Sequence, residues 1–297
     1  MGQVARFLVL LLLAFSVSLL IKCSDDVTAP REDELALTNE EAIDIEMTGL
    51  ASDGVQVDES LGVFSIGWNQ WFRPRHEESE IVGEAFAVGF AEPTNPEPPL
   101  SPEGVSMGEV YLNCPDVQIE LNQKECRNGG IVYSSFSRPF KETGPPVNYF
   151  PDLSYQFEVT GSEQFDPITF SVTSPPALLT VTSHSREDWI EPGEDLTLNW
   201  EGGYENSPVR IFITNHKRHR PRGPRHPLPE DGIIVKLETN SGEYTVPASD
   251  LEDLLSGTPG NRIMVRITQA NITEVGHGGE TILGIVRTGD GVMLHIR

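Results

Sequence analysis

The stretch Pro-Gly-Glu-Asp-Leu-Thr-Leu-Asn-Trp, residues 192–200, decides the fold class. A Pro-Gly turn comes first, and Leu196, Leu198 and Trp200 then alternate with polar residues. Successive side chains of a strand point to opposite faces of a sheet. The stretch therefore predicts a strand that has one buried face and one exposed face.

The same alternation recurs along the rest of the carboxyl-terminal half. Its apolar positions are Val209, Ile211 and Ile213, then Ile233, Val235 and Leu237, then Tyr244 and Val246, then Ile263, Val265 and Ile267, and finally Val292, Leu294 and Ile296. Strands with one buried and one solvent-exposed face are typical of antiparallel sandwiches. A capping box, Ser249 to Glu252, predicts a short helix that ends near Leu255.

Residues 176–297 resemble the immunoglobulin-like and fibronectin-like modules of bacterial surface proteins. The resemblance is carried by residues 192–200, by the strand at 209–213 and by Gly-Glu-Tyr-Thr-Val-Pro at 242–247. It implies a β-sandwich, but it specifies no ligand. No cysteine pair spans this half, as antibody domains would require.

The preceding half also indicates strands. Short segments rich in β-branched and aromatic residues occur at 63–72, 81–91, 105–112, 131–136, 155–159 and 168–172. Residues 92–103 contain five prolines and predict a loop. Ser174-Pro175-Pro176 is the expected domain boundary. We therefore expect an all-β protein with two antiparallel β-sandwich domains, residues 44–175 and 176–297.

The amino terminus predicts export. Residues 7–21 form an apolar run that suits a secretory signal better than a membrane span. Cys23 follows, with Ser24 and two aspartates after it. This arrangement resembles the signal of bacterial lipoproteins, including the export tag of Bacteroidota-like surface lipoproteins, although Lys22 replaces the usual small residue. An ordinary secretory signal and an uncleaved anchor helix are the alternatives.

The resemblance implies that residues 1–22 are a signal peptide and that Cys23 carries the acyl chains. The mature chain would then be held on a membrane, at the bacterial outer membrane or cell surface. Residues 23–43 read as an acidic tether and the start of a short helix expected at about 39–51, for which a strand is the alternative.

Charge excludes one class of partner. After cleavage the chain would hold 19 basic and 45 acidic side chains, a net charge of −26. Such a surface repels nucleic acid, so we expect no nucleic-acid partner.

Cys114 and Cys126 remain once Cys23 carries lipid. In an oxidising compartment an even remainder predicts a disulfide, which would contribute about 3 kcal/mol. There is no Cys-x-x-Cys motif to suggest zinc or redox chemistry.

No set of residues makes a convincing catalytic or metal site. Residues 104–108, Gly-Val-Ser-Met-Gly, match the nucleophile-elbow pattern, but a proline-rich loop precedes them and a strand is expected to follow. His216, His219 and His226 lie among arginines that would repel a metal cation. We therefore expect a protein that is not an enzyme and binds no cofactor.

Aromatic residues near Trp68 and Trp71 could stack on sugars. However, Phe64, Ile66 and Trp68 share one face of the expected strand, so we interpret them as core and leave only Trp71 pointing away.

The most unusual segment is basic. Lys217, Arg218, Arg220, Arg222 and Arg225 lie within nine positions of an otherwise acidic chain. A solvated loop is one interpretation. The functional one is a contact for an anionic polysaccharide or an envelope protein.

These observations predict a non-enzymatic cell-envelope lipoprotein that presents β-sandwich domains for binding or structural interaction. A carbohydrate-binding module and an exported glycan hydrolase are the alternatives.

Overall fold

The computed structural model describes residues 59–72, 79–94, 104–126, 129–135, 145–186, 188–215, 232–256 and 262–297. All of them belong to one compact unit that spans residues 39–297. Several features predicted from the sequence lie outside the described residues: the signal peptide 1–22, the lipidation site Cys23 with its acidic tether, the helix at 39–51 and the basic segment from Lys217 to Arg225.

The described part is mostly β-strand and contains one short helix, α3 (Ala248–Ser256). The strands are β1 (Ser60–Phe72), β2 (Ser79–Thr94), β3 (Val110–Asn113), β4 (Gln118–Glu120), β5 (Asn122–Glu125), β6 (Ile131–Ser134), β7 (Ser154–Val159), β8 (Ile168–Thr173), β9 (Thr180–Val181), β10 (Trp189–Ile190), β11 (Leu196–Glu201), β12 (Val209–Asn215), β13 (Gly232–Leu237), β14 (Glu243–Val246), β15 (Arg262–His277) and β16 (Glu280–Ile296).

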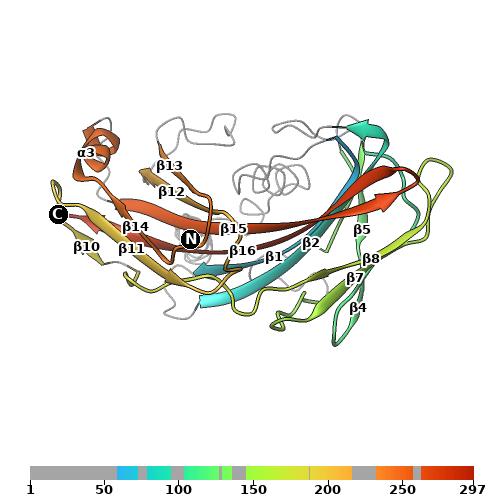
Figure 1. Cartoon of the computed structure of the whole chain (residues 1–297), viewed down its shortest axis with the longest axis horizontal. Helices are drawn as coiled ribbons and strands as arrows, with labels where there is room; N and C mark the ends of the chain where they lie inside the picture. Colours follow the sequence, from blue (N-terminus) through green and yellow to red (C-terminus); the bar gives the residue numbers. More distant parts are fainter. Residues whose placement is uncertain are drawn as a thin grey trace, which may run out of the picture. The chain divides into compact units, whose positions relative to one another are not determined.

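One long sheet organises the described residues. Eight of its nine strands follow the order β13-β12-β15-β16-β1-β2-β6-β5, and the ninth, β10, pairs with β16 off this path. The strands β15, β16, β1 and β2 run side by side through its middle (Figure 1). We call the face with Val286 and Val292 the inner face, and the face with Ile285 and Arg287 the outer face.

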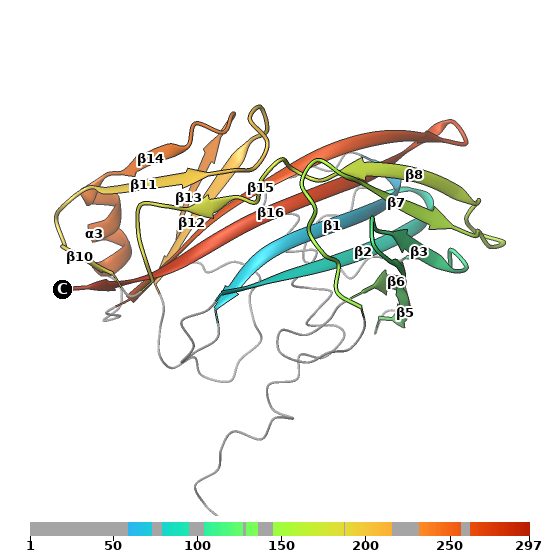
Figure 2. The ribbon, with the colours of Figure 1, turned by 90° about the horizontal axis from the view of Figure 1, so that it is seen from below.

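Two smaller sheets cover the inner face at opposite ends (Figure 2). The sheet β4-β3-β7-β8 packs on β1, β2 and β16 around Phe64, Trp68 and Phe157. The sheet β14-β11-β9 and α3 pack on β12, β15 and β16 around Trp200 and Ile211. Two apolar cores therefore lie side by side on one sheet.

The parallel pairing of β1 with β16 corrects the predicted architecture. Val63 is paired with Leu283 and Trp68 with Thr288, so the sheet is mixed and not purely antiparallel. This pair also makes one continuous sheet from strands of both predicted domains. The predicted boundary at residues 175 and 176 falls between β8 and β9.

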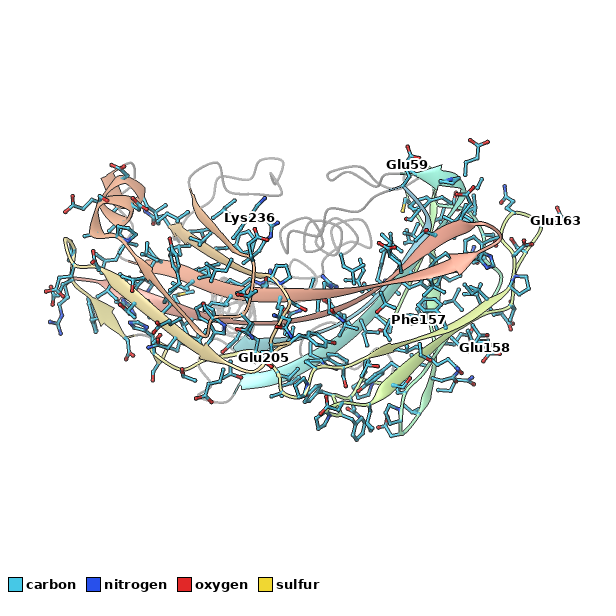
Figure 3. All side chains as sticks on the ribbon, in the orientation of Figure 1. Glu59, Phe157, Glu158, Glu163, Glu205 and Lys236 are labelled. Atoms are coloured by element: carbon cyan, nitrogen blue, oxygen red, sulfur yellow. The ribbon has the colours of Figure 1, made fainter. Side chains whose placement is uncertain are left out.

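Alternation within the strands is confirmed. Leu196, Leu198 and Trp200 are buried, as are the predicted apolar positions of β12 and β15. In β7, Phe157 is fully buried while Glu158 on the opposite side is only partly buried, and Figure 3 labels both side chains.

The helix predicted from the capping box is confirmed as α3, which buries Leu251 and Leu254 in the core. It begins one residue before Ser249. The backbone N–H of Ala248 donates to Asp195 Oδ1 at 2.8 Å, so a residue of the distant 192–200 stretch supplies a hydrogen-bond acceptor at the helix amino terminus.

Candidate functional site

The structure does not join Cys114 to Cys126. Cys114 follows β3 and packs against the core on the inner side of the long sheet. Cys126 follows β5 and is buried among residues of the outer face, such as Val88 and Ile285. The two cysteines therefore follow strands of different sheets, which spacing alone does not reveal.

The environment of Cys114 also disfavours its thiolate. Burial, and to a lesser extent the charge of Asp116, raises the pKa of the Cys114 thiol to about 12. The predicted disulfide finds no support in this arrangement.

The Gly104–Gly108 match has no nucleophile-elbow geometry. Met107 between its serine and last glycine is fully buried, and β3 follows where the motif requires a helix. The backbone carbonyl of Ser106 accepts a hydrogen bond from the Ser162 hydroxyl at 2.5 Å. The segment thus acts as a connection to β3.

The interpretation of Trp68 as a core residue is confirmed. Its side chain is 1% exposed, and its indole N–H donates to the Val147 carbonyl at 2.9 Å. Its ring also packs edge-on against Tyr149 and Tyr155. The side chain of Trp71 lies outside the described part of the chain.

A belt of buried polar residues lies between the two cores on the inner face; we call Gln269, Thr288 and Asp290 the inner belt. The Gln269 amide accepts from the Tyr204 N–H at 2.6 Å and donates to the Tyr204 and Ser207 carbonyls at 2.7 and 2.9 Å. These bonds hold the chain crossing between β11 and β12 against the sheet.

The other two members of the inner belt hold the segment that leads into β9. The Thr288 hydroxyl accepts from the Leu179 N–H at 3.0 Å, and Asp290 Oδ2 accepts from the Val181 N–H at 2.8 Å. Burial raises the pKa of the Asp290 carboxyl above its ordinary value of 3.8, while hydrogen bonds from Val181 and Gly291 oppose this. Each member therefore has a structural task.

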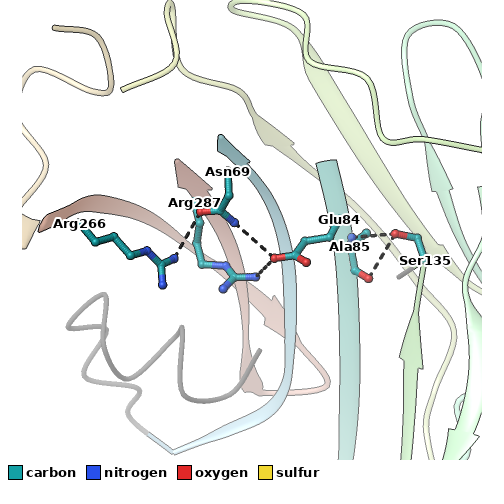
Figure 4. Close-up of polar contacts among 6 residues, drawn as sticks. All are labelled: Asn69, Glu84, Ala85, Ser135, Arg266 and Arg287. Carbon is teal, nitrogen blue, oxygen red and sulfur yellow. Dashed lines mark hydrogen bonds and ion pairs between the residues drawn. The ribbon is translucent and has the colours of Figure 1, made fainter. Parts of the chain in front are cut away.

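A second group of polar residues lies on the outer face of the same strands. Arg287 on β16 and Glu84 on β2 both pair with Gly67, which separates them on β1. Gly67 has no side chain, and the Arg287 side chain lies against it: a Cβ on Gly67 would be 3.4 Å from Arg287 Cβ and 3.5 Å from its Nε and Nη2. Arg287 Nη2 comes within 3.6 Å of Glu84 Oε1 (Figure 4).

Arg266 and Asn69 extend this group, which we call the outer-face cluster (Asn69, Glu84, Arg266 and Arg287). Arg266 Nη2 donates to Asn69 Oδ1 at 3.3 Å, and Asn69 Nδ2 lies 3.5 Å from Glu84 Oε1 (Figure 4). Gly289 lies between these strands, and a Cβ there would come within 3.2 Å of Asn69 Oδ1. Glycines therefore make room for the cluster.

Pairing within the outer-face cluster is incomplete. Arg287 is only 4% exposed, yet its Nε and Nη2 atoms have no hydrogen-bond partner. The hydroxyls of Ser65 and Thr268, on neighbouring positions of the same face, are also buried without one. Buried polar groups are nearly always satisfied, so each such atom calls for an explanation.

A third feature is a hollow of about 420 Å³ beside β10 and β11. Trp189 on its wall is 54% exposed and stacks on the His295 ring with centroids 4.7 Å apart. Polar side chains complete the wall, including Glu191, Glu194 and Asn199. An exposed aromatic ring among hydrogen-bonding groups is suited to a small polar ligand.

His184 and Ser183 also line this hollow. Ser183 Oγ lies 2.7 Å from His184 Nδ1. Burial lowers the pKa of His184 below its ordinary value of 6.5, although the Asp188 carboxylate acts in the opposite direction. The imidazole is therefore largely neutral at pH 7.

Within the described ranges, no three His, Cys, Asp or Glu side chains gather as ligands for a metal ion. No helix in this part of the chain is both long enough and apolar enough to cross a bilayer.

Comparisons with known proteins give only a weak likeness. No protein-family model matches the chain, and no curated protein matches it. Among solved structures, the amino-terminal eight immunoglobulin domains of Down Syndrome Cell Adhesion Molecule share 11% identity over 81% of this chain and 26% of that one, with a TM-score of 0.16. A titin structure shares 9% identity over 81% and 98% of the two chains, also with a TM-score of 0.16. Such a score is too low to transfer a fold or a function.

Sequence reasoning missed the outer-face cluster and the Trp189 hollow. A signal for the cluster exists, because Arg287 directly follows the run Ile282 to Val286, which has the composition of a buried strand. Glu84, which pairs with Arg287, and Asn69, which pairs with Arg266, lie about 200 positions away in the chain, and no local pattern connects them to these arginines.

Proposed function

We propose that this protein is a non-enzymatic lipoprotein of the bacterial cell envelope that presents its β-rich unit to a binding partner. The observation that carries the proposal is the apolar run at 7–21 followed directly by Cys23, Ser24 and two aspartates. Acyl chains on Cys23 would hold the mature chain on a membrane, with the acidic residues that follow as a tether.

In this proposal the unit carries two sandwich-like modules, residues 44–175 and 176–297, which share the long sheet. The separate cores around Phe157 and Trp200 support this division. The second module would be the immunoglobulin-like one, and the outer membrane or cell surface the site of action. The basic segment from Lys217 to Arg225 would contact an anionic polysaccharide or an envelope protein.

The anchor is tested by mass spectrometry of the native amino terminus and by membrane fractionation. We expect an acylated Cys23 as the first residue of the mature chain, and release of the Cys23→Ala variant into soluble fractions. Cys114→Ser is the matched control and should stay with the membrane. Cleavage at another residue, or an unmodified Cys23, contradicts the proposal.

The partner is tested by retention on an anionic polysaccharide and on isolated envelopes at low and high salt. The wild type should bind at low salt and dissociate as salt rises, because exposed ion pairs are weak and screened. A variant with Arg218, Arg220, Arg222 and Arg225 changed to Ser should lose retention. A control that changes Arg186 and Arg297 to Ser should keep it. Equal binding by both variants contradicts this role.

The Trp189 hollow favours carbohydrate binding as a second candidate function. Sugar rings stack on exposed aromatic rings, and Glu194 and Asn199 in the wall offer hydrogen-bonding groups for hydroxyls. Oligosaccharides should quench or shift the tryptophan fluorescence of the wild type but not that of Trp189→Ala. Ile234→Ala, which truncates another exposed apolar residue, is the control. Release of reducing sugar in the same titration would instead favour the hydrolase alternative.

A further inference from the structure

Arg287 is a buried cation whose best donor edge is unused. The Nε and Nη2 atoms form one side of the guanidinium plane, and neither has a hydrogen-bond partner. The 3.6 Å separation between Nη2 and Glu84 Oε1 is an ion pair but not a hydrogen bond. Burying a charged donor without an acceptor is costly, so an acceptor is expected at this edge.

The strand below leaves space for that acceptor. A Cβ placed on Gly67 would lie 3.5 Å from both Nε and Nη2 of Arg287. Gly67 has no positive backbone φ that would require glycine, so its effect is to keep the edge clear. Ser65, two residues earlier on the same face, and Thr268, a diagonal neighbour of Arg287 on β15, add hydroxyls without partners.

Charge selects the kind of acceptor. The described side chains of the outer-face cluster carry two positive charges, on Arg266 and Arg287, and one negative charge on Glu84. A single negative charge balances them, whereas a dianion would leave a buried excess. The two donors of a guanidinium edge match the two oxygens of a carboxylate.

We propose that the outer-face cluster binds a carboxylate, held on the Nε–Nη2 edge of Arg287. Arg266 and Asn69, which are both only partly buried, form the rim by which it enters. The ligand is a free organic acid or the carboxylate of a uronic acid unit, which share this chemistry. The site uses no residue of the basic segment or of the Trp189 hollow, so it goes beyond the proposed function.

The test is nuclear magnetic resonance of the arginine Nε–H groups in the purified mature protein at constant ionic strength. The probes are acetate, glucuronate, inorganic phosphate and neutral methyl glucoside. We expect a saturable shift of the Arg287 Nε–H signal with acetate and glucuronate, and none with methyl glucoside. A higher affinity for glucuronate than for acetate identifies a uronic acid ligand, and equal affinities for the two identify a free organic acid. No shift, or stronger binding of phosphate, overturns the proposal.

Two variants and their controls locate the site. Arg287→Met, in which binding is followed through the Arg266 Nε–H signal, should lower carboxylate affinity roughly tenfold or more, because it removes the bidentate donor. Arg297→Met, which changes a 63% exposed arginine, should leave the affinity unchanged. If Arg287→Met does not fold, Gly67→Ala retains the arginine and fills the space beside its edge, and it should also weaken binding. Gly276→Ala, whose Cβ would meet nothing within 4 Å, is its control. Unchanged affinity in Gly67→Ala overturns the proposal.

Failure here is distinguishable from failure of the proposed function. The variant with four serines in the basic segment retains Arg287 and should show the full acetate shift. Cys23→Ala should show it as well.

Discussion

The two faces of the long sheet differ in how their buried polar groups are hydrogen-bonded at the same point along β15 and β16. On the inner face, Gln269, Thr288 and Asp290 each accept hydrogen bonds from the chain that crosses the sheet. On the outer face, Arg287 and Thr268 are equally buried, yet atoms of both have no partner. Burial alone therefore does not separate a structural polar residue from a candidate binding residue.

The inner belt is complete because it lies between two cores. The segments that enter β9 and β12 pass over it, and each brings backbone groups that need partners away from water. The outer-face cluster is bounded by apolar residues such as Phe86 and Ile285, which offer no acceptor. The comparison predicts that equivalent substitutions on the two faces have unequal effects.

The largest effect is expected for Gln269→Leu. This change leaves the Tyr204 N–H and the Ser207 carbonyl without partners, and it leaves the Tyr204 carbonyl with only the 3.4 Å bonds from Asn240 Nδ2 and the Ser207 N–H. We expect a loss of about 3 kcal/mol of unfolding free energy. Urea unfolding followed by circular dichroism measures it. Gln156→Leu on the exposed side of β7 is the control. A loss below about 1 kcal/mol would show that the inner belt is not structural.

A matched pair of threonines compares the faces directly. Thr288→Val removes the acceptor of the Leu179 N–H and should cost about 1–2 kcal/mol. Thr268→Val removes a buried hydroxyl that has no partner and should change stability by about 0.5 kcal/mol or less, or increase it. The same unfolding experiment serves for both. Equal losses of unfolding free energy in the two variants would contradict the predicted difference between the faces.

A smaller effect is expected in the pH dependence of stability. Burial raises the pKa of Asp290 in the folded chain, so the folded state holds this proton more tightly than the unfolded state. The corresponding stabilisation is complete below the ordinary value of 3.8 and is lost as pH rises through the raised pKa. The wild type should therefore lose stability relative to Asp290→Asn as pH rises in this window. Unfolding free energies at several pH values check the sign, and a constant difference contradicts it.

The smallest effect concerns the cysteines, which lie on opposite sides of the long sheet. A Cys114–Cys126 disulfide would contribute about 3 kcal/mol, whereas the structure predicts that a reducing agent leaves stability unchanged. With its pKa at about 12, Cys114 should react slowly with iodoacetamide at pH 8 until the chain unfolds. Non-reduced, denatured protein should titrate with thiol reagent at both positions. Absence of those thiols would favour the bond predicted from the sequence.

Several local features were predictable because the sequence carries a local pattern for them. The alternation at Leu196, Leu198 and Trp200 indicated both the strand and its buried side. The spacing from Ser249 to Glu252 indicated α3, and the common face of Phe64, Ile66 and Trp68 indicated core. In each case the signal is a side-chain period or a capping motif within a few residues.

The partners of those strands were decided only by the tertiary structure. Alternation shows which side of β1 is buried, but it does not show that β1 pairs in parallel with β16, more than 200 residues later. That pairing brings Gly67 between Arg287 and Glu84, and it places Cys114 and Cys126 on opposite sides of one sheet. The sequence by itself determined the strands and their faces, since period and capping are local properties. The mixed sheet, the inner belt and the outer-face cluster depend on contacts between residues far apart in the chain, which only the folded packing selects.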